Sequence, residues 1–287
     1  MNQEDVLTRE QAYSWARSRY IQAQIVPAQE IQRLYCAVCQ AKEYLFAPEK
    51  LTVSQTRTFR DLVLRRCNHE PLQHLLKEMY FGSFCLFSSP DAFIVRPETE
   101  YLVELALQTE AAQGAQLVAD LCAGSGAIAL APRARASLLS SVHVEISEKA
   151  LGVAKKNLNR YPRQGERIQI TCADVADEQL WAKQAGRFDL IVSNPPYVPE
   201  GAIDQPEALR DPSLALWGGG ENGLLIPTRT VKQAFRLLRP GGVLAMEHDP
   251  SQGEQLNSYA TGIGFSKART RRDLTGRNRY LFAKNRK

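Results

Sequence analysis

The chain has 287 residues, of which 44% are hydrophobic, and a formal net charge of +5 at neutral pH. This length predicts one large domain or two smaller ones, and the hydrophobic fraction excludes a disordered chain. A transmembrane helix is not expected, because no run of about 18 apolar residues occurs. Residues 1–5 are polar and acidic rather than a secretory signal, so the sequence predicts a cytoplasmic protein.

The six cysteines are sparse for this length, and a cytosolic chain is expected to keep them reduced. Cys36 and Cys39 form a single C-x-x-C pair that no second pair of ligands follows, so no metal site is predicted. Because the pair lies within a helical pattern, we interpret it as two packed helix thiols.

Positive charge is concentrated at the C-terminal end. From Lys267 onward the chain has nine basic residues and one acidic residue, Asp273. Such a cluster is typical of a solvated face, and it also fits a surface that meets nucleic acid or a ribosome-associated partner. The sequence leaves these interpretations open.

The first part of the chain is predicted to be helical. Thr8 and Gln11 have the spacing of a capping box, which predicts a helix to about residue 23. A second helical pattern follows Pro27, and a third begins at Ser54. Glycine is absent from residues 1–81, which favours helices over tightly turned strands.

Two short apolar runs follow, at residues 79–87 and 92–95, with the polar segment 88–91 between them. This pattern predicts a β-hairpin that turns in the polar segment. The expected domains are a helical domain at 1–76, a hairpin linker at 77–97 and a larger domain at 98–287.

In the larger domain, helical and strand patterns alternate. Strands are predicted at 117–121, 142–146, 168–172, 188–193 and 243–247, with a closing pair at 265–270 and 279–283. Helices are predicted at 100–112, at 127–136, from Ser147 to about 159, and before the stop signal at 239–242. Alternation of this kind predicts a doubly wound α/β sheet with helices on both faces.

The most informative segment is Asn194-Pro195-Pro196-Tyr197, which follows the predicted strand 188–193. It therefore lies at the carboxyl end of a strand, where open α/β sheets bind their ligands. Two consecutive prolines leave a stiff loop that presents carbonyl oxygens, an Asn amide and an aromatic ring. Such a surface suits a planar nitrogen with two hydrogens, although a rigid loop exit is the plainer interpretation.

The first strand of the larger domain leads into a glycine turn made of Asp120, Cys122, Ala123, Gly124, Ser125 and Gly126. The turn matches neither G-x-G-x-x-G nor a phosphate P-loop, and it contains no basic residue. A dinucleotide or triphosphate would be bound poorly there. A ligand with a cationic centre would be bound well, because Asp120 supplies a negative field.

Acidic residues also follow the next two strands. Glu145 ends the second strand and is expected to accept hydrogen bonds from both hydroxyls of a ribose. Asp174 and Val175 follow the third strand and are expected to border an adenine ring. Together with Asn194 on the fourth strand, these residues predict S-adenosylmethionine, a nucleoside cofactor without phosphates.

The order of these motifs resembles the HemK/PrmC-type glutamine methyltransferases that modify peptide-chain release factors. The resemblance covers residues 67–287 and is looser before them. It rests on the segments Glu70–Gln73, Arg96–Glu100, Ala123–Ala131, Ser193–Tyr197, Asp211–Leu216 and Asp273–Arg279. The chain departs from the family pattern at Cys122, where glycine is usual, and at Glu145, where Asp is more frequent.

The resemblance implies a seven-stranded, doubly wound (Rossmann-like) α/β domain of the class I methyltransferase type, after a small helical bundle that docks the release factor. It implies methyl transfer from S-adenosylmethionine to the side-chain amide nitrogen of the glutamine in the Gly-Gly-Gln loop. Asn194, Pro195, Pro196 and Tyr197 would hold that glutamine. The implied enzyme is a monomer that acts near the ribosome, with no metal and no membrane contact. Direct nucleic-acid binding is not what the resemblance implies, but the basic C-terminal stretch leaves it open.

The chemistry of this reaction assigns roles within the loop. An amide nitrogen is a poor nucleophile, because its lone pair is delocalised into the carbonyl group. Asn194 is expected to accept one N–H of the glutamine and to donate to its carbonyl, while the Pro195 carbonyl accepts the second N–H. Tyr197 is expected to pack on the amide plane.

Two other functions remain open at this point. An exocyclic amine of adenine is also planar with two hydrogens, so an amino-methyltransferase acting on DNA or RNA fits the same loop. A binding module without catalysis is the second alternative. A dehydrogenase is excluded by the glycine pattern.

Overall fold

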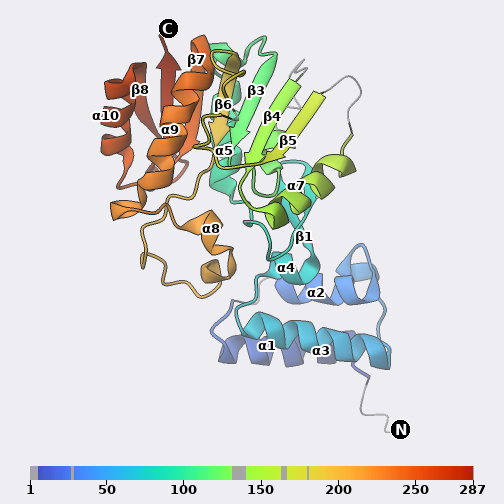
Figure 1. The fold of residues 1–287 in the computed structure, drawn as a ribbon. Coiled ribbons are helices and arrows are strands. Elements are labelled where there is room, and N and C mark those ends of the chain that lie inside the picture. The colour runs from blue at the N-terminus through green and yellow to red at the C-terminus, as the bar shows by residue number, and fades with distance from the viewer. Residues whose placement is uncertain (1–5, 27–28, 131–139, 163–166, 180, 287) are drawn as a thin grey trace. The chain divides into compact units, whose positions relative to one another are not determined.

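The computed structural model describes residues 6–26, 29–130, 140–162, 167–179 and 181–286 (Figure 1). The chain divides into two compact units, Met1–Glu78 and Met79–Lys287. None of the helices in the described residues is both long and apolar enough to cross a bilayer.

The first unit is helical, as predicted. Its elements are α1 (Arg9–Gln22), α2 (Glu30–Cys39), the short 3-10 helix η2 (Tyr44–Phe46), α3 (Val53–Cys67) and α4 (Leu72–Leu76). The capping box predicted for Thr8 and Gln11 is present, and Thr52 forms a second one with Gln55 at the start of α3. The core is formed by buried side chains of α1, α2 and α3, among them Ala16, Tyr20, Ile31, Leu34, Phe59 and Val63.

The C-x-x-C pair lies in α2, as its helical pattern predicted. Both thiols are free, and the Cys39 Sγ donates to the Cys36 carbonyl one turn earlier at 3.7 Å. Pro27 lies outside the described residues.

The predicted hairpin is present, but its turn was placed wrongly. The two strands are β1 (Glu78–Phe81) and β2 (Phe84–Phe87), joined by Gly82 and Ser83. Gly82 has a φ of 54°, the left-handed region that glycine enters without steric cost. Residues 92–95 form no strand, and the backbone N–H of Ile94 instead donates to the Asp211 carboxylate at 3.1 Å.

The second unit contains the predicted seven-stranded sheet. Its strand order is β5-β4-β3-β6-β7-β9-β8. Strands β3 to β7 are parallel neighbours, whereas β9 is antiparallel to both β7 and β8. The strands are β3 (Leu117–Leu121), β4 (Ser140–Glu145), β5 (Arg167–Cys172), β6 (Phe188–Ser193), β7 (Leu238–Glu247), β8 (Phe265–Arg272) and β9 (Asn278–Asn285).

Helices cover both faces of this sheet, so the fold is doubly wound (Figure 1). Alternate residues of β6 show the two faces, because Leu190 and Val192 pack with one helical layer and Ile191 with the other. The first layer contains α5 (Pro97–Leu107), α6 (Ala127–Leu130) and α7 (Glu148–Arg160). The second contains α9 (Leu225–Leu237) and α10 (Gly253–Ile263).

Several boundaries differ from the prediction. Helix α5 begins at Pro97, and a short 3-10 helix, η3 (Glu110–Ala112), follows it. The predicted helix at 127–136 is described only to Leu130, because 131–139 lie outside the described residues. Strand β7 begins at Leu238 and bulges before Val243, where the register with β6 shifts. The remaining short helices are η5 (Ala208–Arg210), α8 (Ser213–Leu216) and η6 (Glu221–Gly223).

Candidate active site

A cavity of about 760 Å³ lies at the carboxyl ends of the parallel strands. Its walls come from the segments that follow β3, β4, β5 and β6, from the end of β7, and from the start of α5. The predicted site residues that line it are Cys122, Ala123, Gly124, Ser125, Glu145, Asp174, Val175, Asn194, Pro196 and Tyr197. The topology therefore brings together residues that are up to 75 positions apart in the chain.

The glycine turn after β3 is held by Glu145. One carboxylate oxygen accepts the backbone N–H of Gly124 at 2.8 Å, and the other accepts that of Ser147 at 2.9 Å. Burial raises the pKa of Glu145, and these backbone hydrogen bonds oppose the shift. Gly126 has a φ of 80° and lies against Ala154 of α7, where a Cβ would come within 3.2 Å of the alanine Cβ.

Asp120 lies beneath this turn rather than in the cavity wall. Its side chain is 1% exposed, and the His143 Nδ1 is 3.9 Å from its Oδ2. Neither carboxylate oxygen has a hydrogen-bond partner among the described residues. Burial raises the pKa of Asp120, partly opposed by His143. Asp120 is therefore not placed to touch a ligand in the cavity, and its charge would act there through space.

Cys122 also borders the cavity, in a backbone conformation that is unusual for a side chain, with a φ of 147°. Burial raises the pKa of its thiol well above the ordinary value, and the charges of Glu145 and Asp120 raise it further. The thiol is therefore neutral at physiological pH and is a packing group rather than a nucleophile.

Asn194 begins a chain of hydrogen bonds that ends on a buried acid. Its Nδ2 donates to the Thr99 Oγ1 at 3.0 Å, and the Thr99 hydroxyl donates to the Glu247 Oε2 at 2.8 Å. The Tyr197 hydroxyl donates to the other oxygen, Oε1, of Glu247 at 2.7 Å. Thr99 comes from α5 and Glu247 from β7, so two distant segments fix both ends of the Asn-Pro-Pro-Tyr loop.

Glu247 is the common acceptor of these hydrogen bonds. Burial raises the pKa of this residue, which is 2% exposed, while the two hydroxyl donors and Arg279 oppose the shift. Burial also raises the pKa of Tyr197, so its phenol stays neutral and donates. Burial lowers the pKa of Arg279, but Tyr197 and Glu247 outweigh this effect and the net shift is upward. A buried carboxylate is thus compensated by two donors and one cation.

A glycine-rich segment supports the loop from behind. The Val198 N–H donates to the Leu216 carbonyl of α8, and the Gly218 N–H donates to the Val198 carbonyl. A Cβ on Gly223 would collide with the Tyr197 carbonyl oxygen. The Gln252 amide donates to that same carbonyl at 2.8 Å. The loop is therefore packed directly on backbone, with no room for side chains at this position.

Pro195 is buried and is not a lining residue, whereas Pro196 and Tyr197 are. Sequence reasoning missed Thr99, Glu247, Arg279 and Gly223 as site residues. Thr99 lies in the segment Arg96–Glu100, one of those that carry the family resemblance, but no role was predicted for Thr99. That segment is also joined to the Asp-Pro-Ser segment, because the Arg96 guanidinium pairs with Asp211 at 2.7 Å.

Within the part of the chain that the structure describes, no cluster of His, Cys, Asp and Glu side chains is arranged to hold a metal ion.

Comparison with known proteins agrees with this architecture. Residues 97–209 match the methyltransferase small domain, and residues 11–76 match the PrmC N-terminal domain. A methyltransferase structure from Pyrococcus furiosus shares the fold with a TM-score of 0.51 and 17% identity, over 79% of this chain and 98% of that one. The second unit is thus a class I methyltransferase fold.

Two relatives identify the family. The release factor glutamine methyltransferase of Bifidobacterium longum is 40% identical over 83% of this chain and 84% of its own length. That of Mycolicibacterium smegmatis is 40% identical over 78% of each chain. The chain belongs to the release factor glutamine methyltransferase family.

Proposed function

We propose that this protein transfers a methyl group from S-adenosylmethionine to the side-chain amide nitrogen of the glutamine in the Gly-Gly-Gln loop of a release factor. Family membership supports the reaction, and one observation in the structure supports its mechanism. The Asn194 amide lines the cavity and is oriented by Thr99 and the buried Glu247. A fixed carboxamide at the carboxyl ends of the strands is suited to hold a second carboxamide.

The described residues fit S-adenosylmethionine. Its sulfonium supplies an electrophilic methyl carbon, so no acid is needed to expel the leaving group. Each Glu145 oxygen accepts one backbone N–H, and a carboxylate has about four lone-pair sites, which leaves one acceptor position on each oxygen for a ribose hydroxyl. Asp174 and Val175 would border the adenine, and the neutral glycine turn would face the methionine part.

Asn194 would hold the substrate amide with the groups that Thr99 leaves unused. Because the Thr99 hydroxyl donates to Glu247, its oxygen accepts from Asn194, which fixes the Nδ2 on the Thr99 side. The second N–H of Asn194 can then donate to the glutamine carbonyl while its Oδ1 accepts a glutamine N–H. Orientation of this kind supplies about 7–11 kcal/mol in well-aligned intramolecular reactions.

The test is the mass of a glutamine-containing Gly-Gly-Gln peptide after incubation with S-adenosylmethionine and the protein. We expect one added methyl, located on that glutamine. Asn194→Ala should bind the cofactor by calorimetry but lose transfer by about 100-fold or more, because positioning is lost. Asn194→Asp should also lose transfer, because a carboxylate cannot donate to the glutamine carbonyl. Full activity of Asn194→Ala, or methylation of an adenine-containing oligonucleotide instead of the peptide, would contradict the proposal.

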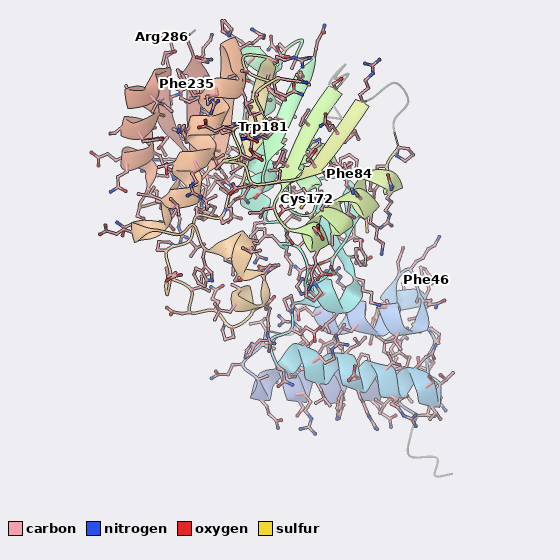
Figure 2. The ribbon with its side chains drawn as sticks, viewed as in Figure 1. Phe46, Phe84, Cys172, Trp181, Phe235 and Arg286 are labelled. Atoms are coloured by element: carbon pink, nitrogen blue, oxygen red, sulfur yellow. The ribbon has the colours of Figure 1, made fainter. Side chains whose placement is uncertain are left out.

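We also propose that the helical unit docks the release factor and that the enzyme works as a monomer in the cytoplasm, near the ribosome. Leu45 and Phe46 of η2 support docking, because they are 74% and 76% exposed. Figure 2 labels Phe46 on the helical unit. Exposed neighbouring apolar side chains are typical of interaction sites. Replacing both with Ser should raise KM for an intact release factor about tenfold, by the loss of two buried apolar side chains, and leave the rate on a short peptide unchanged. Equal KM values of the variant and the wild type for the intact release factor would show that η2 is not part of the docking surface.

A further inference from the structure

The edge strand β8 presents a row of cations that the methyl-transfer site does not use. Lys267, Arg269 and Arg271 occupy alternate positions of β8 and, with Lys284 of β9, line a hollow of about 300 Å³. We call these four residues the basic strip. Within the described residues, Lys267, Arg269 and Arg271 form no ion pair. Lys284 pairs with Glu110 at 3.4 Å, and that glutamate is 90% exposed on the rim.

The fold leaves this face of β8 open. Arg269 and Arg271 pair in register with Phe282 and Tyr280, whose side chains belong to the core on the α5 side of the sheet. On that side α5 and η3 pack over β6 and β7, whereas α10 packs against β8 from the other side. Since β8 is the last strand of the sheet, its outer edge is unpaired, and the cations face a hollow whose opposite wall includes Glu110 and Ala111 of η3.

The arrangement is costly for a surface with no partner. Arg271 is half-buried, with its guanidinium 4.4 Å from the centre of the Phe282 ring. Burial lowers the pKa of Arg271, and the neighbouring charge of Arg269 lowers it further. Four cations beside the single acid Glu110 leave an excess of positive charge, which creates a positive potential that attracts anions. Arg269 and Arg271 are about 6.6 Å apart along the strand, because a strand rises about 3.3 Å per residue, and a bulge between Ser266 and Arg269 separates Lys267 from them. The strip is therefore elongated and suits an extended anion rather than a compact one.

We propose that the basic strip binds the sugar-phosphate backbone of a single-stranded nucleic acid. Planar guanidinium groups match phosphate geometry, and cations placed along a strand can contact successive phosphates. Arg271, held flat on Phe282, also offers a face for base stacking. Contacts to phosphates alone carry no sequence information, so binding is independent of sequence and strongly dependent on salt. This binding does not depend on the methyl-transfer reaction proposed above.

The test is fluorescence anisotropy of a labelled, unstructured 20-nucleotide RNA titrated with the full chain at several salt concentrations. With three or four phosphate contacts, the slope of log K against log salt should be about −2 to −3. The variant Lys267→Gln/Arg269→Gln/Arg271→Gln should bind at least about tenfold more weakly at low salt, with a slope flatter by about 2. The control variant Lys155→Gln/Lys183→Gln/Arg187→Gln removes three exposed cations elsewhere in the same unit and should bind like the wild type. Peptide methylation by both variants should be unchanged, which reports that they are folded.

Three results would overturn the proposal. One is RNA binding with wild-type affinity and salt slope by the Lys267→Gln/Arg269→Gln/Arg271→Gln variant, or an equal loss of RNA binding by the control variant. Another is no detectable RNA binding by the wild type at low salt. The third is competition by polyglutamate as effective as that by RNA, which would assign the strip to an acidic protein surface. Should the triple variant not fold, Arg269→Gln alone is expected to flatten the slope by about 0.7, and an unchanged slope in that variant would be equally decisive.

Discussion

The loop after β3 is held through a backbone amide, that of Gly124, which donates to the Glu145 carboxylate, whereas the loop after β6 is held by side chains that converge on another carboxylate, Glu247. The first anchor, Glu145, is the last residue of β4, the next strand along the chain. The second reaches the loop through Thr99, 148 residues before it. Local anchoring positions a turn for a ligand that touches backbone, and long-range anchoring orients a side chain that must take part in chemistry. Variants of the two anchors should therefore separate binding from turnover.

The largest effect is expected behind the β6 loop. Gly223→Ala places a Cβ against the Tyr197 carbonyl oxygen at a φ of 69°, so the loop must move. A displacement of about 1 Å in a catalytic group can cost about 100-fold in rate, and we expect at least that loss in kcat with the cofactor Kd nearly unchanged. The control is Gly152→Ala, where a Cβ meets no atom within 4 Å. A kcat close to wild type in Gly223→Ala would show that the loop is not held by this contact.

An intermediate effect is expected at Thr99, which links the loop after β6 to Glu247. Thr99→Val removes the acceptor of the Asn194 amide and one donor to Glu247, which leaves two buried groups unpaired. Such groups cost about 1–3 kcal/mol, or about 10–100-fold if the cost falls on the transition state. Steady-state kinetics should show the loss in kcat rather than in the KM for cofactor. Thr99→Ser keeps the hydroxyl and should restore most of the rate, an outcome that simple loss of packing would not produce.

The smallest effect is expected at the β3 loop. Glu145→Gln keeps the size of the side chain but leaves one acceptor oxygen for the two backbone N–H groups of Gly124 and Ser147, so one of these hydrogen bonds is lost. Hydrogen bonds to a charged group contribute about 1.5–3 kcal/mol, so we expect the cofactor to bind about tenfold more weakly. At saturating cofactor, kcat should match the wild type. Calorimetry and kinetics that instead gave a lower kcat with normal affinity would reverse the contrast between the loops.

The sequence was sufficient for most of the sheet, because buried parallel strands such as 117–121 and 188–193 are short apolar runs with turn residues at each end. It misplaced the hairpin turn, because the polar segment 88–91 is a stronger turn pattern than Gly82-Ser83. The loop residues Asn194 and Tyr197 could be selected from their types and order. Thr99 and Glu247 could not, since their importance arises from contacts between segments that only the folded sheet brings together.

Strand β9 has a consequence for when the protein becomes active. It is made last among the strands, yet it lies between β7 and β8, and it brings Arg279 to the cavity and Tyr280 to the Glu98 carbonyl at 2.8 Å. A nascent chain that has not yet reached residue 280 lacks the cation that faces Glu247 and the last contact to the start of α5. The enzyme therefore acquires its complete catalytic wall only after β9 has been synthesised and has paired with β7.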